Sequence, residues 1–381
     1  MLLPVSVCIL VKDSENFLQK CLKSIFDIFA EIIIIDTGST DNSLNIASQF
    51  TNKIYHYQWD HNFSNARNYG IQYVTQPWIL WLDSDEEFII NDLEKFSDLL
   101  NSGFDSFSLC IENILNAKAR STVVVFRLLR TAKNYKYTGI IHEVPEIEMN
   151  KNQEINPEIS YIKHYGYNSD YVDMEQKNKR NLSILQQAVQ LVDKSSWTYI
   201  YNLIYLVREI SNIGSNISNN TEIPNIQQKV NKLYEIEELI NKYSITEIRN
   251  HIVVINFYQE IIHTFSYLQI FELEEYYCLT ALNIFSNDLN LLSMTGECYF
   301  KKGEYYKSII LFKRIINFVK NHGYINGPIA EGLKSYGTLY NIAICYHKIN
   351  DIANTAKYLK LSQKINPNFE PTKRLIERIQ N

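Results

Sequence analysis

The N-terminal half of the chain alternates short apolar runs with segments of helical period. The expected strands are residues 5–11, 31–35, 53–57 and 78–82, and the expected helices are residues 14–29, 41–50 and about 63–74. The first of these strands reads VSVCILV, and each of the others is also of strand length. Because the strands are continuously apolar and alternate with helices, they predict a mostly parallel sheet that is covered on both faces.

Two later segments extend this sheet. SFSLCIEN at residues 106–113 and TVVVFRLLR at residues 122–130 read as further strands, including antiparallel ones. We therefore expect an α/β domain over residues 1–170, with a possible short extension to about residue 190.

From about residue 175 the apolar positions recur only at helical spacing, which predicts an all-α domain over residues 175–381. In two segments of this domain a small residue precedes a Tyr by three positions and a large apolar residue by sixteen. This is the register of tetratricopeptide repeats, and an irregular helical bundle is the alternative. The two sets are Gly296, Tyr299 and Phe312, and Ala343, Tyr346 and Leu359.

Composition and charge exclude several classes of protein. The net charge is -5 and there is no dense Lys/Arg run, so a nucleic-acid partner is not expected. No apolar run approaches the roughly 20 residues that span a bilayer, and the N-terminus does not read as a signal peptide. The 6 cysteines are scattered without a CxxC pair, which disfavours a zinc site or a disulfide scaffold. The expected location is the cytoplasm.

The first candidate site is IIIIDTGSTD at residues 32–41, because Asp-Thr-Gly is also how aspartic proteases present a catalytic aspartate. Such a protease needs two facing carboxylates. The later segment that resembles Asp-Thr-Gly, Asp-Ser-Asp at residues 83–85, lacks the glycine. The surrounding helices also do not suit an all-β protease. We therefore place Asp36 at the carboxyl end of a parallel strand, where open α/β sheets bind ligands. Gly38 would let the turn approach such a ligand.

The second candidate site is Asp83-Ser84-Asp85, which follows the apolar strand WILWL. Two carboxylates, together with diphosphate oxygens and water, would form an oxygen-rich site for Mg²⁺ or Mn²⁺. The alternative is a solvated acidic turn that continues into Glu86 and Glu87.

Four segments occur in the order and spacing of family 2 glycosyltransferases with the GT-A fold, and the chain resembles that family. They are LVKDSENFLQKCLKSI, EIIIIDTGSTDNS, FSNARNYG and WILWLDSDEEF. VVVFRLLR, GIIHEVPE and residues 164–168 are similar to a narrower branch, the bacteriocin (glycocin) peptide glycosyltransferases, which also carry tetratricopeptide-like helices.

The resemblance implies a metal-dependent, inverting transfer of a hexose from a UDP-sugar donor. The acceptor would be a Ser, Thr or Cys side chain of a ribosomal peptide or protein, held by the helical domain. One alternative is a transferase that builds a cell-surface or lipid-linked glycan and uses the helices to form a homodimer. The other is a non-catalytic repeat scaffold.

The resemblance also assigns the donor-binding residues. Glu15 matches an acidic position that holds the nucleotide, and Asp36 matches the aspartate that hydrogen-bonds uracil. Arg67 matches an arginine near the sugar nucleotide, with an arginine on the helix surface as the alternative. Asp83 and Asp85 match the metal motif, with Asp85 as the direct ligand and Asp83 closer to the ribose or sugar.

The remaining candidates lie nearer the acceptor and the diphosphate. Glu143 is the first candidate for the base that takes the acceptor's proton, and His142 is the alternative base or a phosphate contact. His164 would complete the metal or diphosphate shell, unless it is a packed core histidine. Arg127 and Arg130 could reach the diphosphate or lie on a sheet edge.

Overall fold

The structure of the chain, a computed structural model, divides into two compact units. The first comprises Met1–Asn202, and the second contains Leu203–Ile325 and Ile329–Asn381. The last described strand ends at His164, and the boundary between the compact units lies further along the chain, within a helix. The structure describes residues 2–114, 120–146, 151–166, 174–216, 226–249, 251, 253–322, 333 and 335–380.

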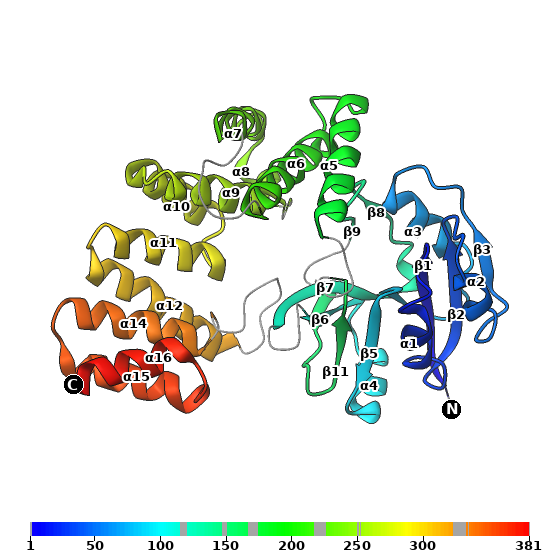
Figure 1. Ribbon diagram of the computed structural model, residues 1–381, viewed down its shortest axis with the longest axis horizontal. Helices are drawn as coiled ribbons and strands as arrows, with labels where there is room; N and C mark the ends of the chain where they lie inside the picture. The colour runs from blue at the N-terminus through cyan, green and yellow to red at the C-terminus, as the bar shows by residue number, and fades with distance from the viewer. Residues whose placement is uncertain are drawn as a thin grey trace. The chain divides into compact units, whose positions relative to one another are not determined.

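The first unit is built on a sheet of nine strands in which most neighbours are parallel (Figure 1). Its main path has the order β3-β2-β1-β4-β7-β6-β11-β5, and β10 pairs with β6. The pairs β4–β7, β6–β7 and β5–β11 are antiparallel. The strands are β1 (Leu3–Val11), β2 (Phe29–Asp36), β3 (Ile54–His56), β4 (Trp78–Asp83), β5 (Glu86–Ile90), β6 (Ser106–Ile114), β7 (Arg120–Arg130), β10 (Asn152–Glu154) and β11 (Ser160–His164), and β8 (Tyr137–Thr138) pairs with β9 (Val144–Pro145) in a small second sheet.

Both faces of the large sheet are apolar, because the central strands are continuously apolar and successive residues of a strand point to opposite sides of the sheet. On one face Val7 and Ile9 pack with Leu22 and Phe96. On the other face Cys8 packs with the half-buried Tyr69. The helices that supply these contacts are α1 (Leu18–Lys23), α2 (Ser43–Ala47), α3 (Phe63–Ile71) and α4 (Leu93–Leu100).

Helix α1 is shorter than the sequence pattern predicted for residues 14–29. Its periodic apolar residues continue into a run of turns, in which Ile25 N–H donates to Leu22 O and Phe29 N–H donates to Ile25 O. These residues are buried in the same core as the helix. The pattern therefore identified most of the buried positions, although Phe26 is 44% exposed, and it overestimated the length of regular helix.

The described part of the chain beyond residue 174 contains helices and no strand, as the sequence predicted. In Figure 1 the helices of the second unit follow one another from green to red. No described helix meets the length and apolarity needed for a membrane span. The helices are α5 (Met174–Leu191), α6 (Trp197–Asn216), α7 (Ile226–Ile240), α8 (Ile245–Arg249), α9 (Val253–Tyr267), α10 (Phe271–Ile284), α11 (Leu289–Lys301), α12 (Tyr305–His322), α14 (Tyr336–Lys348), α15 (Ile352–Ile365) and α16 (Glu370–Gln380).

The helix pairs show the packing that the repeat register predicted. Gly296 of α11 lies against Phe312 of α12, so closely that an added Cβ would meet the Phe ring at 2.9 Å. Ala343 of α14 packs with Leu359 of α15 in a second core cluster. The small and large residues sixteen positions apart are therefore packing partners. The expected fold class, a mostly parallel α/β domain followed by tetratricopeptide-like helices, is confirmed.

Candidate functional site

The carboxyl ends of parallel strands bring two of the candidate aspartates to one edge of the sheet. In the register of β1, Val11 lies opposite Asp36 of β2, and Leu10 lies opposite Asp83 of β4. Strand β1 lies between the other two. Both aspartates therefore lie at the edge where open α/β sheets bind ligands.

Asp36 is a buried carboxylate that neighbouring loops hold in place. Its Oδ1 accepts a hydrogen bond from Ser39 N–H at 2.9 Å, and its Oδ2 lies 3.0 Å from Nδ1 of His56. Burial by itself raises the pKa of Asp36, but hydrogen bonds from Ser39 and His56 outweigh burial and hold the pKa below its ordinary value. Gly38, with a φ of 103°, turns the chain beside this charged acceptor.

Glu15 joins the loop after β1 to the loop after β2. Its carboxylate accepts from Asn42 N–H at 3.1 Å, and its own N–H donates to Asp41 at 3.0 Å. Asp13 makes a parallel link, because its Oδ1 accepts from Thr40 N–H at 2.7 Å. In this arrangement Glu15 organises the loops at the sheet edge, and its contact with a nucleotide stays a prediction.

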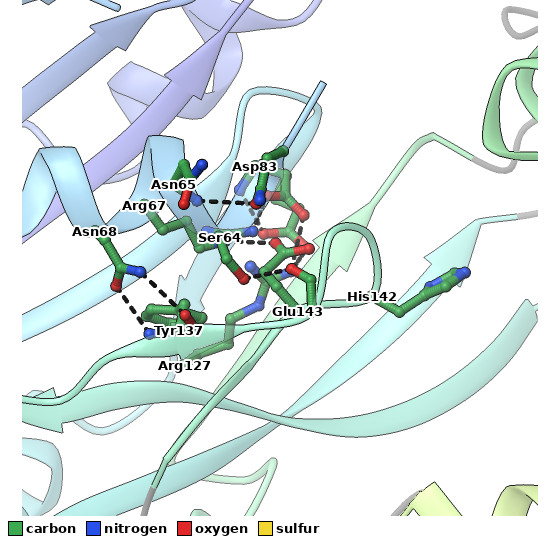
Figure 2. Close-up of polar contacts among 12 residues, drawn as sticks. Ser64, Asn65, Arg67, Asn68, Asp83, Arg127, Tyr137, His142 and Glu143 are labelled. Atoms are coloured by element: carbon green, nitrogen blue, oxygen red, sulfur yellow. Dashed lines mark hydrogen bonds and ion pairs between the residues drawn. The ribbon is translucent and has the colours of Figure 1, made fainter. Parts of the chain in front are cut away.

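Asp83 lies between two arginines (Figure 2). Arg67 Nη2 donates to Oδ1 of Asp83 at 3.0 Å, and Arg127 Nη2 donates to Oδ2 at 2.9 Å. Arg67 is only 6% exposed, so it is not the surface arginine of the alternative interpretation. Burial raises the pKa of Asp83, but the two arginines outweigh it and hold the pKa far below its ordinary value. Both oxygens of Asp83 are thus engaged by arginines.

Glu86 is buried next to this pair, with 2% of its surface exposed. Arg127 Nη2 donates to its Oε1 at 2.7 Å, and Asp83 N–H donates to its Oε2 at 2.8 Å. Burial raises the pKa of Glu86 to about 7, against the lowering effect of Arg127. The turn at residues 83–85 therefore does not continue into solvent through Glu86, because that residue begins strand β5.

Asp85 faces His164 at the end of β11. Oδ2 of Asp85 lies 3.5 Å from Nε2 of His164, and the other ring nitrogen of His164 lies 2.8 Å from Oδ1 of Asn113. Burial lowers the pKa of His164, but the interaction with Asp85 raises it above its ordinary value. Asn113 orients the ring, which leaves Nε2 directed at Asp85. The structure thus brings together two of the predicted metal ligands.

The Asp85–His164 pair fits a divalent metal ion. Gly166 closes the space beside it, because a Cβ at this position would lie 2.2 Å from Asp85 Oδ2 and 2.6 Å from His164 Nε2. A carboxylate and an imidazole suit Mn²⁺, and the carboxylate also suits Mg²⁺. Within the described ranges no group of three or more His, Cys, Asp or Glu side chains is placed to hold a metal. A metal here would take its other ligands from substrate and water.

The structure separates the two base candidates. Glu143 is turned into the network of Figure 2, and its Oε1 accepts from Nε of Arg67 at 2.6 Å. The ring of His142 points away from Glu143 in the same view. His142 has a φ of 57°, which is uncommon for a residue other than glycine. Glu143 is therefore the better-placed candidate base.

The loop that carries Glu143 is attached to two helices. Phe63 N–H at the start of α3 donates to Ile140 O at 2.9 Å, and Ser64 Oγ donates to Gly139 O. The hydroxyl of Tyr201 on α6 donates to His142 O. These contacts place the loop in a defined position in the first unit.

Sequence reasoning missed several residues of this site. Glu86 lies in an acidic run that reads as solvated, and Asn113 lies in an ordinary strand. Tyr201 carries no local signal at all. Arg130, the other arginine considered for the diphosphate, has a different role: its guanidinium lies 4.4 Å from the Trp78 ring and donates to backbone carbonyls.

Comparison with known proteins finds similarities to part of the α/β unit. Residues 6–137 match the model of glycosyl transferase family 2. A TPR repeat-containing protein of Synechococcus elongatus is 33% identical over 177 residues, which cover 44% of this chain and 43% of that protein. The SPbeta prophage-derived glycosyltransferase SunS of Bacillus subtilis is 27% identical over 206 residues, covering 52% of this chain and 48% of SunS. The chain thus spans about half the length of these curated relatives.

Solved structures give weaker likenesses. The structure of S. aureus TarS 1–349 covers 70% of this chain and 91% of its own, with 13% identity and a TM-score of 0.39. YrrB, a TPR protein with an unusual peptide-binding site, covers 53% of this chain and 84% of its own, with 12% identity and a TM-score of 0.38.

Proposed function

We propose that this chain, whose residues 6–137 form a glycosyl transferase family 2 domain, transfers a hexose from a UDP-sugar to a Ser, Thr or Cys side chain of a ribosomal peptide or protein, with inversion and with a divalent metal ion. The observation that carries the proposal is the gathering of Asp36, Asp83 and the Asp85–His164 pair at one edge of the sheet. The donor and a ribosomal peptide are both made in the cytoplasm, so the proposed reaction takes place there.

The donor would lie across the strand ends. The charged carboxylate of Asp36 can accept the imino N–H of uracil, and Gly38 lets the backbone turn close to the base. Asp85 and His164 would hold Mg²⁺ or Mn²⁺, which neutralises the charge that develops on a departing diphosphate. Asp83, held by two arginines, keeps the metal-binding turn in place rather than acting as a metal ligand itself.

The acceptor would approach the loop at residues 139–143. An inverting transfer needs a group that takes the acceptor's proton as it attacks the anomeric carbon. Glu143 is oriented for this role by its hydrogen bond from Arg67. If the acceptor is a cysteine, its thiolate needs less help from a base. In that case substitution of Glu143 by glutamine would slow transfer less than it would for a hydroxyl acceptor.

The second unit carries a surface that suits a bound peptide. Tyr306 is 69% exposed and Ile310 is 65% exposed, and their spacing of four places them on one face of α12. A depression of about 320 Å³ nearby is lined by Gly303, Glu304, Tyr305, Tyr306, Lys307 and Ile349. Stacked helix pairs present extended surfaces of this kind. The helices would thus hold the acceptor.

The proposed reaction is tested by following UDP release from a panel of UDP-sugars. We expect release that requires Mg²⁺ or Mn²⁺ and stops when a chelator is added, because the diphosphate leaves with its charge neutralised. Re-addition of the metal should restore the rate. Release of UDP from no sugar in the panel, or release that a chelator does not change, would contradict the proposed reaction.

The class of acceptor is tested by intact-mass analysis with candidate peptides that contain Ser, Thr or Cys. A mass increase of one hexose on a peptide supports the peptide acceptor. Metal-dependent UDP release with no hexose on any peptide would instead favour a glycan acceptor. Fragmentation of the product peptide would locate the sugar on its side chain.

Gly166→Ala is expected to weaken metal binding by about 10- to 100-fold, a size typical of disturbing the surroundings of metal ligands. The new Cβ would occupy space now filled by Asp85 Oδ2 and His164 Nε2, at 2.2 and 2.6 Å. Gly103→Ala is the matched control, since nothing lies within 4 Å of its added Cβ. Titration with Mn²⁺, followed by electron paramagnetic resonance, measures the Mn²⁺ affinity of each variant. Equal affinities for the two variants would contradict the assigned metal position.

A further inference from the structure

We propose that Arg67 is a positioning residue: its buried guanidinium clamps Asp83 of the metal-binding turn (residues 83–85) to Glu143 of the acceptor loop (residues 139–143). The inference rests on the proposed function and adds a positioning role to the place near the sugar nucleotide that the family resemblance implied for this arginine. It goes beyond that function because it states how the donor half and the acceptor half of the site are held in register.

The clamp follows from the way one guanidinium serves two carboxylates. Nε of Arg67 donates to Glu143 Oε1 at 2.6 Å, and Nη2 donates to Asp83 Oδ1 at 3.0 Å. The nitrogens of a guanidinium are fixed in one plane, so two such bonds determine the relative placement of both carboxylates. A lysine ammonium carries the same charge but does not impose this geometry.

The side chain of Arg67 is itself held in place by its surroundings. Arg67 as a residue is 6% exposed, and its Cζ lies 4.9 Å from the Trp81 ring and 5.6 Å from the Tyr137 ring. Helix α3, which carries Arg67, also holds the acceptor loop through Phe63 N–H. The acceptor loop is therefore attached to this helix through its backbone and through Glu143, and Arg67 extends the link to Asp83 (Figure 2).

The third nitrogen of the guanidinium, Nη1, takes no part in the two bonds of the clamp. Nη1 of Arg67 is buried without a hydrogen-bond partner in the described part of the chain, and so are Trp81 Nε1 and Tyr137 Oη. Leaving a buried polar group unpaired is unfavourable, and an ordered water or a bound ligand commonly satisfies such a group. The two bonds of the clamp do not use Nη1, so either partner leaves the clamp intact.

Two measurements on the full chain test the clamp. In a crystal structure with UDP and Mn²⁺, we expect the bonds from Arg67 to Asp83 and to Glu143 to be unchanged. Loss of either bond in the complex would overturn the proposal. This result is independent of turnover, so it stands apart from a failure of the transferase assignment itself.

The kinetic measurement uses Arg67→Lys, which keeps the charge. We expect kcat to fall about 100-fold, as a misplacement of about 1 Å can cost, while the UDP dissociation constant changes less than threefold. A tenfold weaker UDP affinity with unchanged kcat would overturn the proposal. Arg130→Lys is the matched control, because that arginine also packs on a tryptophan of the same domain but outside the site, and its kcat should not change.

Discussion

Replacing Asp85 with alanine is expected to lower hexose transfer about a thousandfold and to remove its response to Mg²⁺ or Mn²⁺. Asp85 is the carboxylate that faces His164, at 3.5 Å, while the oxygens of Asp83 are taken by arginines. A bound divalent metal contributes several kcal/mol of charge stabilisation in the transition state, and each 1.36 kcal/mol is tenfold in rate. Transfer rates measured across a titration with Mg²⁺ or Mn²⁺ show both the fall in rate and the loss of its dependence on the metal.

The control for Asp85→Ala is Glu94→Ala, which removes the same charge from an exposed position on α4. It should leave the rate and the metal response unchanged. Circular dichroism of both variants checks that the fold is kept. If Asp85→Ala retains full, metal-dependent transfer, the metal does not lie at Asp85, and the assignment of the acidic turn fails.

Replacing Arg127 with methionine is expected to destabilise the first unit by about 3–5 kcal/mol at pH 8, the usual cost of breaking a buried ion pair. Arg127 serves both Asp83 and Glu86 from the sheet interior. The double variant with Glu86→Gln should recover part of the loss, since it removes one of the two carboxyl groups that the single variant leaves without Arg127. All four tryptophans lie in the first unit, so urea unfolding followed by tryptophan fluorescence reports its stability.

The deficit of Arg127→Met should also depend on pH. Burial raises the pKa of Glu86 to about 7, above its ordinary 4.5, so the folded protein keeps a proton that the unfolded chain releases. The stability from this group is complete below pH 4.5 and is lost as the pH rises through about 7. Removing Arg127 raises that pKa further, so the deficit should grow between pH 6 and pH 8. The loss of stability in the double variant could instead equal the sum of the losses in Arg127→Met and Glu86→Gln at every pH. That result would show that Arg127 and Glu86 do not interact.

The sequence predicted the features of the fold that local pattern determines. Continuous apolar strands and intervening helices identified the sheet, and the strand ends at Asp36 and Asp83 identified its ligand-binding edge. The spacing of Gly296 and Phe312 identified a helix pair, because these residues pack directly against each other. In each case the sequence pattern and the residues that it places lie within one strand or a few helical turns of each other.

The rest of the site depends on contacts between distant segments, which no local pattern shows. Glu86 reads as part of a charged turn, yet antiparallel pairing of β5 with β11 places it opposite His164 and inside the protein. The pairing of Arg67 with Glu143 joins a helix to a loop far along the chain. The choice between His142 and Glu143 rests on which of these two adjacent side chains accepts a hydrogen bond from Arg67, and sequence alone does not indicate this.

The most direct test of the proposed function is a crystal structure of the full chain with UDP and Mn²⁺, recorded with anomalous diffraction from manganese. The proposal predicts an anomalous peak bound by Asp85 and His164, with the diphosphate on the same ion and the uracil at Asp36. An anomalous peak elsewhere, with Asp85 facing solvent and UDP bound away from the strand ends, would contradict it.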